Sequence, residues 1–188
     1  MSDDESTGPL GSSGEPAAAR EGTRTEVRPL TLEQVTTLIE APERFPQQYG
    51  LSLADGYLAF PEALAFTRDV LAAGAAPEWF SHLIVDPDAA EVVGLGGYTG
   101  PPADGVVEIG YSVAPGRRGR GHATAAARTW IASARAHGAV RMIAHTLAEE
   151  GPSTAVLRRC GFTRAAQVED PEEGPVWRWE LPLAVDDR

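Results

Sequence analysis

The sequence has a single cysteine, no long apolar run and few basic residues. Because Cys160 stands alone, the chain can form neither an internal disulfide nor a cysteine-based zinc cluster. No uninterrupted apolar stretch is long enough to cross a bilayer, so we expect no membrane partner. The acidic, polar beginning of the chain also lacks the basic start and apolar core of a secretory signal. These absences together predict a cytoplasmic protein.

Basic residues are outnumbered, since 16 Lys and Arg against 27 Asp and Glu give a formal net charge of -11. A non-specific nucleic-acid binder needs a basic face to release counterions from phosphates, so we expect no nucleic-acid partner. The acidity has two readings that stay open, namely simple solubility, which we favour, and attraction of a cationic, amine-bearing substrate. One region differs, because Arg117, Arg118 and Arg120 stand together without a nearby acid in the sequence.

The chain of 188 residues suffices for one domain with a substantial core. Residues 1–23 are rich in Gly, Ser, Pro and acids, which predicts a disordered tail. We predict that the folded domain covers residues 24–183 and that residues 184–188 form a short C-terminal tail.

Hydrophobic periodicity and turn residues predict strands and helices in a defined order. Thr31 and Gln34 form a capping-box pair before a helix, and Gly138 stands where a left-handed cap would end the helix over 121–137. Residues 41–60 are predicted to be irregular, forming either a wall of a substrate site or a cap on the core. Strands are predicted over 25–29, 79–85, 91–98, 106–113 and 141–147, further helices over 61–72 and 153–160, and a closing hairpin over 163–183.

The three consecutive strands between residues 79 and 113 are joined by short turns, which predicts an antiparallel meander. The whole order predicts a single α/β domain with a mixed, mostly antiparallel central sheet and helices on both faces.

The most informative stretch is 106–124, VVEIGYSVAPGRRGRGHAT, in which a strand is followed by an arginine-glycine loop and a helix start. Gly119 and Gly121 allow the backbone to approach a ligand closely. Free N–H groups at the helix start, the helix dipole and three arginines then make an anion site suited to a diphosphate. The alternative is a tight turn with a solvated basic surface. No GK[ST] follows, so a P-loop is excluded, and Thr124 does not fit the dinucleotide fingerprint.

These residues resemble a known family. Arg118-x-x-Gly121-x-Ala123 is similar to the R-x-x-G-x-G/A signature of the GNAT superfamily of N-acetyltransferases. Upstream, residues 108–111 resemble the strand that precedes the signature. Downstream, residues 153–162, STAVLRRCGF, resemble the second motif, S-x-x-V-L-x-K-x-G-F. The most similar subgroup is that of the RimJ/RimL-like ribosomal-protein alanine N-acetyltransferases, and the resemblance covers about residues 24–183.

The resemblance implies acetyl-CoA as the acyl donor and an amine as the acceptor. It implies that the backbone of Tyr111, Ser112 and Val113 pairs with the pantetheine arm, and that Ser153 lies near the thioester sulfur. The His122 side chain would either contact phosphate or face solvent. The main-chain N–H groups implied to bind the pyrophosphate belong to Arg118, Gly119, Arg120, Gly121, His122, Ala123 and Thr124.

The reaction requires an amine to lose a proton, attack a thioester and expel a thiolate. Glu108 is the candidate general base, directly or through water, because it lies on the strand that enters the cofactor site. Otherwise it is an ordinary strand carboxylate or a hydrogen-bonding partner. Ser153 would protonate or stabilise the thiolate, or would be only an N-cap. Both sets of alternatives stay open.

Two positions depart from the family pattern. Glu150 stands where many relatives have Asn, which adds a carboxylate that would favour a cationic amine, and Leu157 stands where many have a tyrosine general acid. His145 is either a substrate-side group or a satisfied core residue, and without convergent partners it predicts no metal site. Cys160 is expected to be buried and not nucleophilic.

We therefore predict an enzyme that transfers acetyl from acetyl-CoA to a primary amine by direct attack in a ternary complex. A peptide or protein N-terminus is the favoured acceptor. A small amine such as a polyamine, antibiotic or amino acid is the alternative, and a non-catalytic acyl-CoA sensor is the rival from another class. The oligomeric state stays open, with a homodimer as the default expectation.

Overall fold

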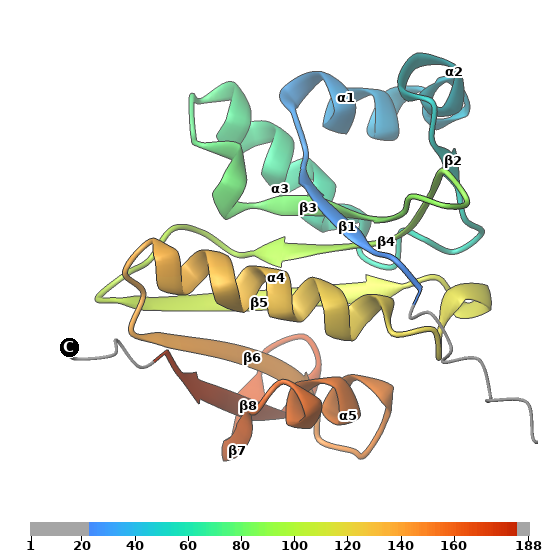
Figure 1. Cartoon of the computed structure of the whole chain (residues 1–188). Helices are drawn as coiled ribbons and strands as arrows, with labels where there is room; N and C mark the ends of the chain where they lie inside the picture. The colour runs from blue at the N-terminus through green and yellow to red at the C-terminus, as the bar shows by residue number, and fades with distance from the viewer. Residues whose placement is uncertain (1–22, 184–188) are drawn as a thin grey trace, which may run out of the picture.

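A mixed sheet runs through the molecule, and the helices are divided between its two faces (Figure 1). The computed structural model describes residues 23–183, so nearly all of the predicted N-terminal tail and the whole of the predicted C-terminal tail lie outside the described residues. The strands are β1 (Glu26–Pro29), β2 (Ser52–Leu53), β3 (Ser81–Asp86), β4 (Glu91–Tyr98), β5 (Val106–Val113), β6 (Arg141–Leu147), β7 (Thr163–Asp170) and β8 (Gly174–Pro182). The helices are α1 (Leu32–Glu40), α2 (Phe45–Tyr49), α3 (Pro61–Ala72), α4 (His122–Ala136) and α5 (Pro152–Arg159), with short 3-10 turns η1 (Pro42–Arg44), η2 (Pro77–Trp79) and η3 (Pro115–Arg117).

Most predicted elements are confirmed. The capping box of α1 forms as expected, because the Thr31 hydroxyl accepts from the Gln34 N–H and the Gln34 side chain accepts from the Thr31 N–H. Gly138 adopts the left-handed conformation expected after α4. The prediction that residues 41–60 are irregular is wrong in part, because η1, α2 and β2 lie there. The five residues of α2 and the two of β2 are too short to give a clear periodic pattern.

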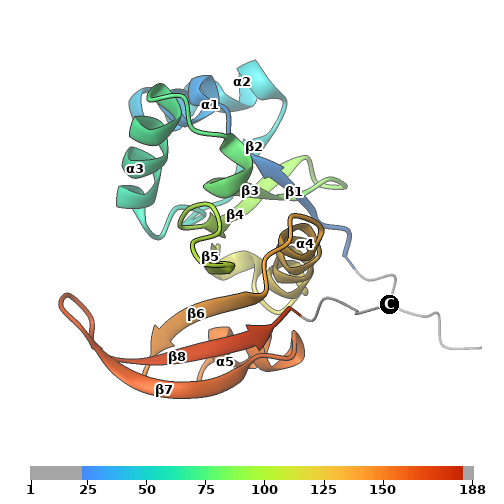
Figure 2. The same cartoon turned by 90° about the vertical axis from the view of Figure 1, so that its left-hand side faces the viewer.

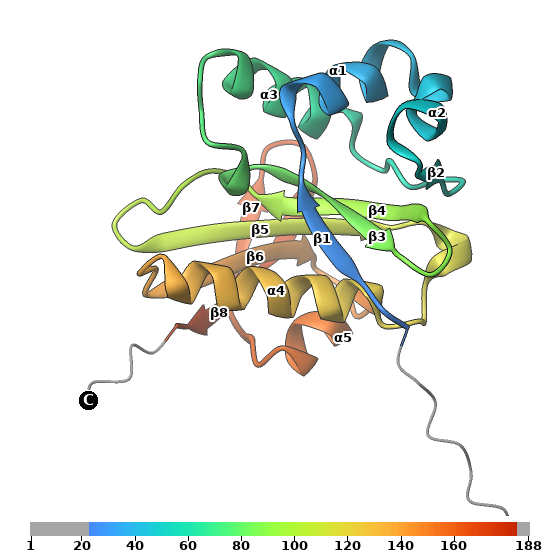
Figure 3. The same cartoon turned by 45° about the horizontal axis from the view of Figure 1, so that its top comes forward.

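The sheet has the order β1-β3-β4-β5-β6-β8-β7, with β2 paired to β4, and the predicted meander of β3, β4 and β5 is antiparallel. Among the described strands, the parallel pairs are β5 with β6 and β2 with β4. Helices α1, α2 and α3 cover one face, whereas α4 and α5 cover the other (Figure 3). Each face has its own buried apolar cluster, so the sheet separates two cores and is mixed and mostly antiparallel, as predicted.

Trp130 of α4 anchors the larger core and is 1% exposed. Its indole Nε1 donates to Nδ1 of His82 at 2.7 Å, and its carbonyl accepts from the Tyr98 hydroxyl at 2.6 Å. Burial lowers the pKa of His82 to about 4, which keeps the ring neutral and able to accept the indole proton. Gly96 of β4 lies directly beneath the Trp130 ring, and a Cβ there would collide with it. A helix with a large aromatic side chain can therefore sit close to the sheet.

No helix in residues 23–183 combines the length and the apolar character that a membrane crossing requires.

Candidate active site

The arginine-glycine loop connects the end of β5 to the start of α4. After η3 the chain passes through Gly119 and Gly121, with φ values of 75° and 90°, and Gly121 is the N-cap of α4. In the part of the chain that the structure describes, the backbone N–H groups from Gly119 to Thr124 donate to no protein acceptor. An added Cβ at either glycine would meet no atom within 4 Å, so the space beside these two glycines is open. Free donors, open space and the positive end of a helix of 15 residues fit a diphosphate.

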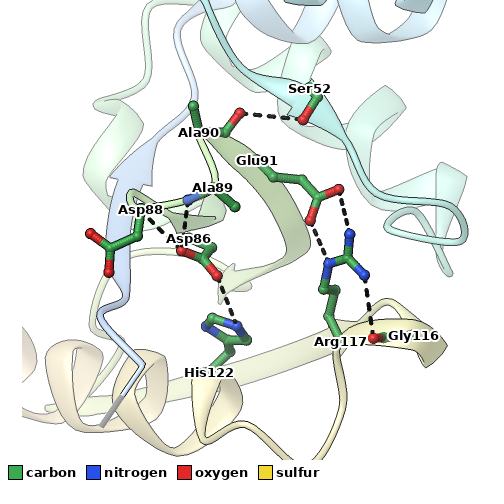
Figure 4. A network of polar contacts seen from close by, with 9 residues as sticks. All are labelled: Ser52, Asp86, Asp88, Ala89, Ala90, Glu91, Gly116, Arg117 and His122. Carbon is green, nitrogen blue, oxygen red and sulfur yellow. Dashed lines mark hydrogen bonds and ion pairs between the residues drawn. The ribbon is translucent and has the colours of Figure 1, made fainter. Parts of the chain in front are cut away.

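The three arginines of the loop have different environments. Arg117 is bound to the carboxylate of Glu91 at the start of β4, through its Nε and through Nη2, which lies 2.9 Å from Oε1 (Figure 4). No acidic residue lies close to Arg117 in the sequence, but the fold brings the carboxylate of Glu91 into contact with it. The Arg118 Nε donates to the carbonyl of Val113 at 3.0 Å, which leaves its terminal nitrogens for an anion. Arg120 is exposed. Arg117 thus anchors the loop, and Arg118 and Arg120 are the remaining cations.

The His122 side chain faces neither phosphate nor solvent, since the residue is 1% exposed. Its Nδ1 lies 2.9 Å from the Thr25 hydroxyl, and its Nε2 lies 3.8 Å from Oδ2 of Asp86 at the end of β3 (Figure 4). Burial lowers the pKa of His122, against the opposing influence of Asp86. Both readings of this side chain from the sequence are corrected, because it is buried beside Asp86 and forms a hydrogen bond with Thr25, the residue just before β1. Only its backbone N–H stays available for the anion site.

The Glu91–Arg117 pair leads to a first prediction. We expect Glu91→Gln to weaken coenzyme A binding by roughly tenfold, because η3 loses a charged, bidentate contact that sets the position of the loop. Isothermal titration measures the effect. Asp88→Asn is the matched control, because Asp88 lies in the same β3–β4 turn and its ion pair with Arg24 is exposed. Equal weakening by both variants would contradict a specific role for Glu91.

A cleft opens beside the loop because β5 and β6 separate. The two strands are paired only where Val106–Glu108 meets Arg141–Ile143, and β6 then runs away from β5 (Figure 2). From residue 109 to the end, β5 stays paired with β4 on its other side. The backbone of Tyr111, Ser112 and Val113, which the sequence implies for pantetheine pairing, therefore faces the opening with one edge.

A cavity of 660 Å³ lies in this opening. Its walls come from the segment before α3 and its first turn, from β4, β5 and β6, from the start of α5 and from the β7–β8 turn. Residues 58, 60, 62 and 63 belong to it, so part of the segment predicted over 41–60 does form a wall of the site. Tyr111, Ser112, His145 and Ser153 line the same space. The fold thus brings together candidate residues that lie far apart in the sequence.

Glu108 is not an isolated strand carboxylate, because its Oε1 lies 2.7 Å from Nδ1 of His145. The pair forms at the point where β5 and β6 separate, with each side chain about one-third exposed (33% for His145 and 34% for Glu108). The sequence left His145 open between a substrate-side group and a core residue. Its exposed position in the cavity wall contradicts the core reading, and the substrate-side role stays a prediction. In the sequence, only the location of His145 on the predicted strand 141–147 indicated where its side chain would lie.

Ser153 lies in the first turn of α5, exposed and in the cavity wall. It is not the N-cap, which is Gly151, so that alternative is wrong. The carbonyl of Ser153 accepts a hydrogen bond from the Tyr111 hydroxyl at 3.1 Å. Burial raises the pKa of Tyr111, so its hydroxyl stays protonated and able to donate. Tyr111 therefore ties the start of α5 to β5 across the opening.

The positions that depart from the family pattern are explained by local contacts. Glu150 forms a two-point ion pair with Arg158, whose Nη2 lies 2.6 Å from Oε1, and this contact holds the Glu150 pKa at about 2. Its charge is therefore balanced by Arg158, and the preference for a cationic amine stays a prediction. Leu157 is fully buried in the core. Burial raises the pKa of the half-buried Cys160 thiol, in agreement with a structural role.

Comparisons with known proteins agree with this geometry. A family described as an acetyltransferase (GNAT) domain matches residues 24–163. The curated proteins give no match. A ribosomal-protein-S5-alanine acetyltransferase from Vibrio fischeri has a similar structure, with a TM-score of 0.61 and 16% identity over 87% of this chain and 94% of that one.

Two further solved structures have the same TM-score of 0.61. One is a spermidine N-acetyltransferase chimera from Vibrio cholerae and hSSAT, with 12% identity over 85% of this chain and 95% of that one. The other is RimL, a ribosomal α-N-protein acetyltransferase in complex with coenzyme A, with 19% identity over 85% and 94%. At these sequence identities, the similarity shows that the folds are alike and does not extend to the substrates.

Fold and site thus define an enzyme that handles acyl-coenzyme A. Because the family match covers most of its length, the chain belongs to the family of GNAT acetyltransferase domains. It is an acyl-CoA-dependent N-acetyltransferase. Acetyl-CoA is the donor that this family uses, and the free N–H groups from Gly119 to Thr124 fit its pyrophosphate.

Proposed function

We propose that the protein transfers an acetyl group from acetyl-CoA to a primary amine by direct attack in a ternary complex. The observation that supports this best is the position of the cavity, which lies where β5 and β6 separate and is lined by Tyr111 and Ser112 of β5, the strand that leads into the arginine-glycine loop (the anion loop). Donor and acceptor can then occupy one space from opposite sides. Direct attack is favoured because Cys160, whose thiol pKa is raised, is no activated nucleophile.

Each proposed role belongs to a group whose position fits it. The N–H groups from Gly119 to Thr124, with Arg118 and Arg120, would hold the pyrophosphate. The open backbone edge of residues 111–113 would align the pantetheine arm. The thioester supplies an activated acyl group when the donor is bound. Ser153 would donate a hydrogen bond at the sulfur, because its exposed hydroxyl lines the cavity.

A peptide or protein N-terminus is the first candidate acceptor. The RimJ/RimL-like motifs of the sequence support it, as do similar structures that carry the names of ribosomal-protein acetyltransferases. A small cationic amine is the second candidate, because four acidic residues line the cavity and no arginine does. The acidic residues are Glu62, Glu149, Asp170 and Glu173.

Release of free thiol from acetyl-CoA tests the proposal, with the acetylated product identified by mass spectrometry. We expect turnover with a peptide that begins with alanine and none with the same peptide blocked at its N-terminus. The chain contains no lysine, so its own side chains offer no competing amine. A larger kcat/KM for spermidine than for the peptide would select the second acceptor. Coenzyme A binding without thiol release for any amine would identify a sensor and contradict an enzyme.

A further inference from the structure

We propose that His145 is the general base that takes the proton from the acceptor amine, and that Glu108 is the residue that positions its ring. This assignment rests on the proposed function and deepens it, because the sequence motifs point to Glu108 alone. The geometry that supports it is the contact of 2.7 Å between Glu108 Oε1 and His145 Nδ1.

The two members of the pair differ in what they face. His145 lines the cavity, whereas Glu108 does not contribute to its wall. One Glu108 oxygen is occupied by the imidazole ring. Since a carboxylate only accepts hydrogen bonds, Nδ1 must carry the proton that joins the two groups. The other ring nitrogen, Nε2, has no protein partner within residues 23–183 and keeps a lone pair that can accept a proton.

The charges around His145 suit a group that becomes positive during the reaction. Glu108 lies on β5, and Arg178 lies opposite on β8, where its Nη2 is 2.9 Å from Oε1 of Glu180. Asp170 at the end of β7 is kept ionised by the N–H groups of Glu172 and Glu173, which lower its pKa.

Glu149 and Glu173 complete the charged groups of the cavity on this side. Around His145, carboxylates therefore outnumber Arg178, which lies outside the cavity wall and whose charge is shared with Glu180. An imidazolium at this place is stabilised by its carboxylate partner, as in other base–carboxylate pairs.

The proton balance is simple. The amine nitrogen forms a bond to the acyl carbon, and the carbon–sulfur bond of the thioester breaks with its electron pair on sulfur. One proton leaves the amine for Nε2 of His145. The released thiolate takes up one proton from the protonated His145, either through solvent or through the Ser153 hydroxyl, which donates its own proton and receives the one from His145. The protein thereby returns to its initial state.

Two variants separate the base from its positioning residue. We expect His145→Gln to lower kcat by about 10²–10⁴-fold and to remove the acidic limb of the pH profile of kcat/KM, with coenzyme A binding unchanged. We expect Glu108→Ala to lower kcat on the order of tenfold and to keep that limb, because the base is still present. Alanine is preferred to glutamine at position 108, since an amide N–H facing Nδ1 would place the ring proton on the wrong nitrogen.

Two controls exclude a structural effect. His137→Gln removes a histidine at the end of α4, outside the cavity wall, and should leave kcat unchanged. Added imidazole should restore part of the activity of His145→Ala, which a merely structural role would not allow.

The outcomes are distinct. If His145→Gln keeps its activity and its acidic limb while Glu108→Ala loses both, Glu108 is itself the base and the assignment is overturned. If the native protein binds acetyl-CoA but acetylates no amine, the proposed function fails, and the assignment fails with it.

Discussion

Gly121→Glu is expected to weaken coenzyme A binding by at least about 100-fold, because it places a carboxylate among the free N–H donors at the start of α4. A Cβ at position 121 would meet no atom within 4 Å, so the side chain starts in open space, and its carboxylate is expected to compete for the donors that the pyrophosphate needs. Isothermal titration with coenzyme A measures the loss. Gly121→Glu alone is easier to interpret than a double variant that also removes the Arg118 side chain. The hydrogen bond from Arg118 Nε to the Val113 carbonyl supports the end of β5, so its loss would disturb the strand as well.

Strain at position 121 must be separated from charge, since φ there is 90°. Gly121→Asn is the control, because asparagine tolerates the left-handed conformation better than other side chains and carries no charge. It should retain most of the affinity. Gly138→Glu repeats the same substitution at the other end of α4, where φ is 80°, and should leave binding intact. Native affinity in Gly121→Glu would show that the pyrophosphate does not bind at this loop.

The fold was largely accessible from the sequence because its signals are local. The capping pair of Thr31 and Gln34, the proline that starts α3 and the turn residues between strands each mark an element boundary within a few residues. The anion loop was accessible for the same reason, since glycines before a helix start define its geometry without help from distant residues. Short pieces such as α2 and β2 have too few residues for a periodic pattern, and tertiary contacts decide them.

The side-chain environment of the site was not accessible in this way, because it depends on pairs that are distant in the sequence. Glu91 and Arg117 are 26 residues apart, and Glu108 and His145 are 37 apart. Such contacts follow from strand register, and nothing in a single sequence fixes the register of β5 against β6. The burial of His122 has a similar origin. Its position beside an anion site suggests exposure, and only the fold shows that Thr25 and Asp86, which are distant in the sequence, lie against its ring.

Trp130→Ala is expected to lower the free energy of unfolding by about 3–5 kcal/mol, the range for removing a fully buried large aromatic side chain. Gly96 makes this cavity hard to refill, because it offers no side chain to move into the space that the indole leaves.

The consequence would extend to the site, since the Tyr111 ring stacks against Trp130 with centroids 6.4 Å apart and its hydroxyl holds the start of α5. Trp130→Phe keeps most of the volume but leaves Nδ1 of His82 without its donor, so a smaller loss of about 1–2 kcal/mol is expected. Urea unfolding monitored by circular dichroism measures both variants. A loss below about 1 kcal/mol for Trp130→Ala would mean that the helix can settle onto the sheet without its anchor. In that case the close approach of α4 to β4 would not depend on the pairing of Trp130 with Gly96.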